Sequence, residues 1–497
     1  MRRVLIYLFL FEGLFCSCED FLESRDKSSI LEDKLFVDQE GIEEAMYGLY
    51  VTLADKSMYG QTFPVTIDLL GQYYQVGHKE GEESGEGMMD VVIRHNHSAD
   101  EAMNRYSSIW STGYKFISDA NKIIEALNEW TGNPLRHEKL YRGEVIGLRA
   151  YVHFDLLRMF GSVQQNKRGI PYVTQYGMYV TPFSTTGECY EKVIAELKQA
   201  ESLLTADEEY LVYPRLPENS YDPYVSDRTV HFNLYAAKAT LARVYWTRNN
   251  PGDLDSAAMY AREVIESARF PLPSDGNTIT ANHFIKMMGG TVADDEGIFG
   301  LFLSDSYSLW KDVCLKESAA YMPAETGLYM RTDQKVDHRQ EWIAVPNIPE
   351  LSTELQLVRY GYRYLKMIDR SQVNSSDAEL AAEGFTGVNM VRIPEMYLIL
   401  TEALLEKSSE EARDLFSQYT SSRGMGKFDG ELTINEIDME FRKEFLQEGQ
   451  YWFRLRRRQV PEIKLIPALG GTLRMDEMKW SLGIPDAEFE FRPEGSY

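Results

Sequence analysis

The stretch Gly147–Gly161, GLRAYVHFDLLRMFG, decides the fold. Placed on a helix, its apolar side chains point in every direction and leave no face for solvent. A helix that is apolar all round is buried, so other helices must pack against both of its sides. Its polar residues form two spaced pairs, Arg149/His153 and Asp155/Arg158. We expect this helix to begin near His137 and to end at Gly161 in a left-handed cap.

Further helices are predicted on both sides of this central one. Apolar residues recur at helical spacing in residues 38–56, 101–130, 186–204, 231–247, 254–268, 391–407, 410–420 and 435–458. They form pairs of about 34 residues, the size of tetratricopeptide repeats, without that repeat's consensus. We therefore predict a mainly α protein, an α-superhelical stack of tetratricopeptide-like helix pairs. Residues 271–385 break this pattern with short apolar runs and many turn formers, which predicts an irregular, loop-rich segment with short strands.

Composition narrows the possible partners. The chain has 497 residues, of which 44% are hydrophobic, and a formal net charge of −25. Nucleic acid binding is not expected, because contacts to phosphates need a basic surface. The four cysteines have no spacing that suggests a zinc site or a disulfide-stapled domain. A bridge between Cys189 and Cys314 is left open beside the alternative of two buried thiols.

The N-terminus has the pattern of a targeting segment. Arg2 and Arg3 precede the apolar residues 4–11, a run too short to span a bilayer. The sequence LFCSC at residues 14–18 is similar to a bacterial lipobox, with Ser17 just before Cys18. We expect residues 1–17 to be a lipoprotein signal peptide, cleaved before Cys18, with lipid attached to the Cys18 thiol. The alternative is a plain secretory peptide with an incidental cysteine.

Paired carboxylates near the C-terminus could suggest hydrolytic chemistry. Glu444 and Glu448 lie four residues apart, a spacing that allows a glycosidase pair, but they are close to four arginines: Arg454, Arg456, Arg457 and Arg458. Arginines at this distance keep carboxylates ionised, which disfavours a general acid. We therefore predict a structural ion-pair network here, and interpret Glu395, Glu402 and Arg392 in the same way.

Other motifs give no metal or cofactor site. His95 and His97 could supply two ligands, but no further histidine or cysteine lies close in sequence. The triplet Asp294-Asp295-Glu296 lacks the alternating spacing of a calcium loop and is interpreted as a solvated turn. Glycine-rich phosphate loops and nucleophile-elbow serines are also missing from the sequence.

Five stretches, in order along the chain, resemble one family. They are CEDFLE at residues 18–23, LRAYVHFDLLRMFG at 148–161, VRIPEMYL with TEA at 391–403, FRKEFLQEGQYWFRLRRR at 441–458, and IPDAE at 484–488. Together they are similar to the SusD/RagB outer-membrane lipoproteins. Phe441, Tyr451 and Arg454 depart from that family's usual residues. Each motif is weak alone, but their order over nearly the whole chain is specific.

The resemblance implies a non-catalytic, cell-surface lipoprotein of the outer membrane. It implies binding of an oligosaccharide, or alternatively a peptide, and its delivery to a SusC-like TonB-dependent transporter. The expected divisions are a signal peptide (1–17), an N-terminal helical region (18–270) and a C-terminal region with the loop-rich insertion (271–497). A glycan hydrolase on a helical scaffold and a purely protein-contacting scaffold are the rival interpretations from other classes.

The family motifs contain no ligand motif, so candidate binding residues come from the residues alone. Sugars stack on exposed aromatic rings, and aromatics in irregular stretches are better candidates than those in helix stripes. The expected ligand-binding edge consists of Tyr73, Tyr74, Tyr307, Trp310, Tyr321 and Trp342.

Overall fold

The computed structural model describes residues 35–75, 87–214, 222–226, 228–273, 296–303, 309–310, 313–314, 321–330, 336–345, 362–367, 387–490 and 492. The predicted signal peptide, Cys18 and Tyr307 lie outside these residues. Within them the protein is mainly helical, as predicted, and its strands form only two-stranded antiparallel sheets.

The described helices follow the predicted order. They are α3 (Gln39–Ala54), α4 (Thr62–Leu70), α5 (Met88–Ile93), α6 (Asp100–Asn128), α7 (Glu138–Phe160), α8 (Thr186–Leu203), α9 (Asp207–Tyr210), α10 (Pro223–Ser226), α11 (Leu234–Arg248), α12 (Asp253–Glu266), α17 (Ile393–Leu404), α18 (Ser409–Ser422), α19 (Ile434–Glu444) and α20 (Tyr451–Arg458). Two of them, α4 and α5, lie in residues 60–99, where the sequence analysis found no helical pattern. Every residue of α4 is buried, so this short helix has no polar face that could reveal its period.

The strands pair as four short ladders. They are β1 (Arg168–Pro171) with β2 (Phe183–Thr185), β3 (Gly297–Phe302) with β6 (Gly387–Arg392), β4 (Ile343–Ala344) with β5 (Arg363–Tyr364), and β7 (Glu462–Lys464) with β8 (Thr472–Arg474). Residues 271–385 were expected to contain short strands, and β3 is one of them.

The central helix α7 is enclosed on all sides. All sixteen residues from Val145 to Phe160 are buried, which confirms the prediction. Its polar side chains are paired: Arg149 bonds Glu196 of α8 at 2.7 Å, and the Arg158 Nε donates to Asp155 at 2.6 Å. Paired in this way, charged groups can lie in the core without the cost of an isolated charge.

The end of α7 differs from the expected left-handed cap. Gly161 has φ −74° and ψ 157°, which is extended backbone. Close packing favours glycine at this position, because a Cβ there would lie 2.8 Å from both the Cδ1 and the carbonyl oxygen of Leu157. The Gly161 carbonyl accepts hydrogen bonds from Arg456 and Ser481, so the C-terminal segment closes over this end of the helix.

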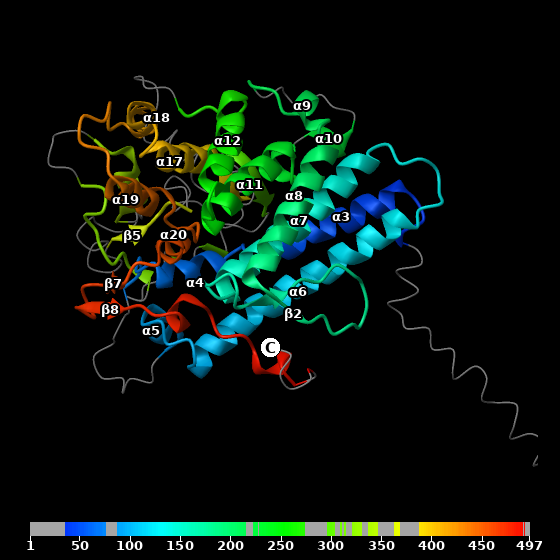
Figure 1. The fold of residues 1–497 in the computed structure, drawn as a ribbon, viewed down its shortest axis with the longest axis horizontal. Coiled ribbons are helices and arrows are strands. Elements are labelled where there is room, and N and C mark those ends of the chain that lie inside the picture. Colours follow the sequence, from blue (N-terminus) through cyan, green and yellow to red (C-terminus); the bar gives the residue numbers. More distant parts are fainter. Residues whose placement is uncertain are drawn as a thin grey trace, which may run out of the picture.

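The helices pack one on the next in a series that contains α7 (Figure 1). Helix α3 packs on α6, α6 on α7, and α7 on α8; the series continues through α11, α12 and α17 to α18. One hydrophobic cluster extends through the whole stack, from Ile42 to Ile484. Among the described residues, no helix has both the length and the apolar character needed to cross a membrane.

The predicted helix 435–458 is two helices, α19 and α20. Residues between them turn through left-handed conformations, with φ 60° at Gln447 and φ 64° at Gly449. The Gln447 N–H donates to the buried Asp68 carboxylate of α4 at 2.6 Å, and Gly449 packs on α4, where a Cβ would lie 3.0 Å from the Pro64 Cα. Contact with α4 therefore breaks a segment whose local periodicity is helical.

Candidate functional site

The expected aromatic edge is mostly part of the core. Tyr73, Tyr74, Trp310 and Trp342 are at most 1% exposed, so their ring faces are not available for stacking on a sugar. Tyr321 is half-buried and packs edge-on against Tyr74, with ring centroids 5.7 Å apart. The expectation of an exposed edge at the four buried positions is corrected by this observation.

Pairing between distant segments explains this burial. The backbone around Tyr74 bonds to residues 322–324, with the Gln75 N–H donating to the Met322 carbonyl at 2.8 Å. The Tyr73 hydroxyl donates to the Arg442 carbonyl, and Tyr364 donates to the Tyr73 carbonyl at 2.7 Å. These contacts give the buried hydroxyls of Tyr73 and Tyr364 hydrogen-bond partners within the protein, as buried tyrosines require.

Two cavities in the described part of the chain lie on either side of α18. The larger, which we call the α12–α18 cavity, has a volume of about 660 Å³. Its apolar wall comes from Ile265 and residues 270–273, and Tyr397 of α17 adds a ring. Its polar wall comes from one face of α18, with Asp414, Ser417, Gln418, Ser421 and Ser422.

The smaller, the α18–α19 cavity, has a volume of about 400 Å³. Phe416 and Phe428 form its apolar part, and their rings pack edge-on at 4.9 Å. Asp429, Asn435 and Glu436 are among its polar lining residues. Lys427 lines both cavities, so the loop after α18 separates two adjoining hollows.

Two hydroxyl groups of the α12–α18 cavity can bond a ligand. Ser417 is 7% exposed, and its buried Oγ has no hydrogen-bond partner within the described structure. A buried hydroxyl without a partner is uncommon and is satisfied when a ligand or water binds. Burial, and secondarily the Glu296 carboxylate, raises the pKa of Tyr397, so its hydroxyl remains a donor at neutral pH.

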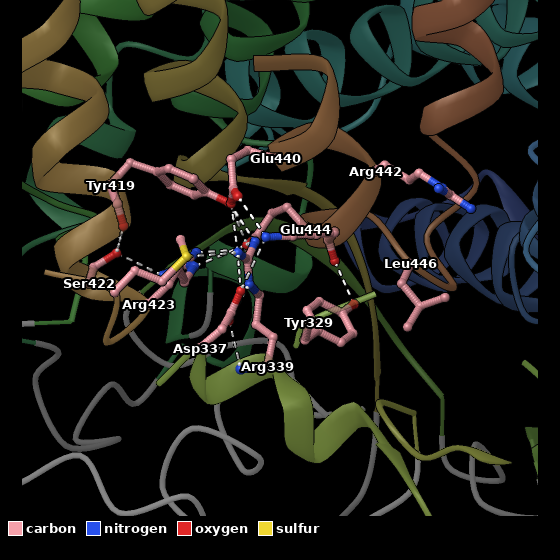
Figure 2. Close-up of polar contacts among 12 residues, drawn as sticks. Tyr329, Asp337, Arg339, Tyr419, Ser422, Arg423, Glu440, Arg442, Glu444 and Leu446 are labelled. Atoms are coloured by element: carbon pink, nitrogen blue, oxygen red, sulfur yellow. Dashed lines mark hydrogen bonds and ion pairs between the residues drawn. The ribbon is translucent and has the colours of Figure 1, made fainter. Parts of the chain in front are cut away.

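A buried charge network lies beside the α18–α19 cavity and joins α18 to α19 (Figure 2). Arg339, on the short 3-10 helix His338–Trp342, bonds Asp337 at 2.8 Å, Glu440 at 2.6 Å and Glu444 at 3.1 Å. Tyr419 of α18 donates to Glu440 at 3.2 Å and to Glu444 at 3.0 Å. Since Glu440 also lines the α18–α19 cavity, the network holds α18 and α19 in register around it.

Glu444 is the centre of this network. Besides Arg339, it pairs with Arg423 at 2.9 Å and Arg392 at 2.8 Å, and all four side chains are at most 1% exposed. Burial alone would raise the pKa of Glu444, but Arg423, Arg392 and Arg339 outweigh it and hold that pKa well below its usual 4.5. The carboxylate is therefore ionised and cannot serve as a general acid at neutral pH.

The network also includes Arg392 of β6 and Glu296, which directly precedes β3. Glu296 pairs with Arg423 at 2.7 Å and with Arg392 at 3.1 Å, and Arg392 also pairs with Glu448 at 2.6 Å. Glu296 is therefore fully buried, which corrects the interpretation of residues 294–296 as a solvated turn, at least for this residue. Residues 294 and 295 lie outside the described part.

The predicted ion pairs of these glutamates and arginines are present, but Glu444 does not pair with the arginines of residues 454–458. Arg454 and Arg457 hold Glu402, with Arg457 at 2.6 Å, and Arg454 also bonds Asp438 at 2.6 Å. Arg456 donates instead to backbone carbonyls. The break between α19 and α20 turns the arginine-rich helix away from Glu444, so sequence neighbours are not the partners.

The candidate ligands noted in the sequence have other contacts. His95 bonds the carbonyls of Leu70 and Lys479, and His97 bonds Tyr106 and the Lys479 carbonyl. Burial lowers the pKa of His95 to about 3 and that of His97 to about 4, so both rings are neutral. Cys189 and Cys314 are free, buried thiols and are not bridged.

Sequence reasoning did not find the cavity residues. Asp414, Gln418 and Ser421 occupy the polar side of an amphipathic helix, where a solvated face and a ligand-binding face have the same pattern. Their place at the cavity depends on Ile265 and residues 270–273, which come from a distant part of the chain.

Comparison with known proteins places the fold. Residues 20–246 match the family model SusD-like_3, described as "Starch-binding associating with outer membrane". SusD-like protein P38 of Formosa agariphila is 23% identical over 95% of this chain and 93% of its own length. The chain is therefore similar to SusD-like proteins over nearly its whole length.

Solved structures of SusD-like proteins share this architecture. A SusD superfamily protein of Bacteroides thetaiotaomicron has a TM-score of 0.70 at 19% identity, covering 92% of this chain and 98% of its own. A SusD-like carbohydrate binding protein of Bacteroides vulgatus has a TM-score of 0.65 at 15% identity, covering 91% and 96%. The family description links SusD-like proteins to starch binding and to the outer membrane.

Proposed function

We propose that this SusD-like protein captures an oligosaccharide at the cell surface and delivers it to a SusC-like TonB-dependent transporter. The observation that carries the binding step is the α12–α18 cavity, with an apolar wall facing a row of hydroxyl, amide and carboxylate groups. Its volume of about 660 Å³ lies within the range of ligand sites. A sugar also has both kinds of surface, because its ring faces are apolar and its edges carry hydroxyl groups.

The comparisons support the same ligand class. The family model is described as starch-binding, and two similar structures from Bacteroides vulgatus are named as a carbohydrate binding protein and a putative sugar binding protein. Delivery to a transporter rests on the family resemblance, and co-purification of a SusC-like protein with the full-length chain tests it.

A cavity-filling substitution tests the site. Ser421→Trp places an indole in the α12–α18 cavity, and we expect it to weaken glycan binding by about tenfold or more. Ser409→Trp is the matched control, because Ser409 is exposed on the same helix and does not line the cavity. The measurement is retardation in native gels that contain a panel of glycans, followed by titration calorimetry on the best ligand.

Each outcome of this experiment has a clear meaning. Binding that both variants retain would place the site elsewhere on the protein. Retention of peptides with no glycan binding would replace the proposed ligand class, and new reducing ends in the glycan would contradict capture without turnover.

The lipid anchor is tested separately. We propose that Cys18 carries the lipid, so Cys18→Ser is expected to abolish acyl labelling and release the protein from the membrane fraction, because stable anchoring needs the attached chains. Cys16→Ser is the control and is expected to leave labelling intact. Labelling that persists in Cys18→Ser and disappears in Cys16→Ser would assign the anchor to Cys16.

A further inference from the structure

The charged groups at the two cavities are mostly acidic. Asp414, Asp429 and Glu436 line them and are exposed or half-exposed, whereas Lys427 is the one cation among the exposed lining residues of the described structure. Lys443 also lines the α18–α19 cavity, but it is only 8% exposed and pairs with Glu440 at 3.2 Å. A ligand that extends over both cavities therefore meets three exposed or half-exposed carboxylates and one exposed lysine, whereas the α12–α18 cavity alone has one of each, Asp414 and Lys427.

Two arginines bond residues that line the cavities, but their own side chains are buried. Arg339 bonds Glu440, and Arg423 donates to Ser422. Arg339 and Arg423 are fully buried, and each bonds at least two carboxylates of the network. None of the residues that line either cavity is an arginine. Recognition of a carboxylate or sulfate relies on accessible arginine or lysine groups, and the lining supplies few of them.

The same lining suits uncharged hydroxyl groups. Carboxylates such as Asp414 accept strong hydrogen bonds from hydroxyls. Gln418 and Asn435 each offer a donor and an acceptor, and the Ser417 hydroxyl has no partner. The net charge of −25 adds a long-range repulsion of polyanions.

We infer that the ligand of this site is a neutral oligosaccharide, and that glycans bearing carboxylate or sulfate groups are rejected by the carboxylates around the cavities. This inference rests on the proposed function and specifies its substrate class.

The test compares matched polymers. Starch, xylan, mannan and dextran are each offered to the full-length protein beside their own carboxymethyl derivatives, in native gels and by calorimetry. We expect the unmodified form of the bound polymer to bind about tenfold or more tightly than its derivative, since like charges in contact are costly. Raising the salt to about 0.5 M is expected to narrow that difference.

Two double variants assign the effect to the cavities. Asp414→Asn with Asp429→Asn is expected to strengthen binding of the derivative severalfold, and to change binding of the neutral polymer less. Glu101→Gln with Glu129→Gln removes the same charge from exposed positions at the two ends of α6, and is expected to leave the preference unchanged.

The outcomes separate the two proposals. Equal or tighter binding of the carboxymethyl form would overturn the inference and leave glycan capture intact. An equal response of both double variants would also overturn it, because general charge would then explain the preference. Failure of every polymer to bind would overturn glycan capture itself.

Discussion

Replacing Glu444 by glutamine is expected to lower the free energy of unfolding by about 3–5 kcal/mol, the cost of removing one partner from a buried ion pair. The carboxylate bonds Arg339, Arg392 and Arg423, which are buried and would face an uncharged amide. Denaturant unfolding of the purified protein measures the effect. Glu406→Gln is the control, because Glu406 is exposed and the same chemical change there is expected to cost little.

The pH dependence gives this prediction a second readout. Because the pKa of Glu444 is lowered in the folded state, its contribution to stability is present above the unfolded pKa, about 4.3, and is lost as the pH falls through the folded pKa. The stability difference between the native protein and Glu444→Gln should therefore shrink as the pH falls below about 4. A difference that is constant from neutral to acidic pH would show that the network does not depend on this charge.

Replacing Phe154 by alanine is expected to lower the free energy of unfolding by about 3–5 kcal/mol, the usual cost of a phenylalanine-sized cavity in a core. Phe154 is fully buried near the middle of α7, with the Tyr190 ring of α8 at 6.3 Å and the Arg158 guanidinium at 5.1 Å. Packing around α7 is close, so the vacated volume cannot collapse without moving whole helices.

The matched control is Phe302→Ala at the end of β3, where the side chain is 59% exposed. Thermal and denaturant unfolding of both variants compare the same chemical change inside and outside the core. Similar losses in the two proteins would contradict the enclosed position of α7.

Much of the helical scaffold follows from local pattern. Asp38 caps α3 by accepting from the Gly41 N–H, and Thr185 and Glu188 form a capping box at the start of α8. The binding site does not follow in this way. Tyr73 and Trp342 lie in irregular stretches, which makes their exposure plausible, yet backbone pairing between residues 73–75 and 322–324 and the packing around them bury both rings.

The amino-acid sequence by itself determined the buried helix α7, most other helices of the stack and the family motifs. Periodicity, caps and short motifs are properties of neighbouring residues. The tertiary structure alone decided the break between α19 and α20, the partners of Glu444 and the cavities beside α18. Each of these depends on groups that are remote in sequence, as when the Asp68 carboxylate bonds the backbone of Gln447, 379 positions away. Local spacing carries no information about such a contact, which forms only when the whole stack has assembled.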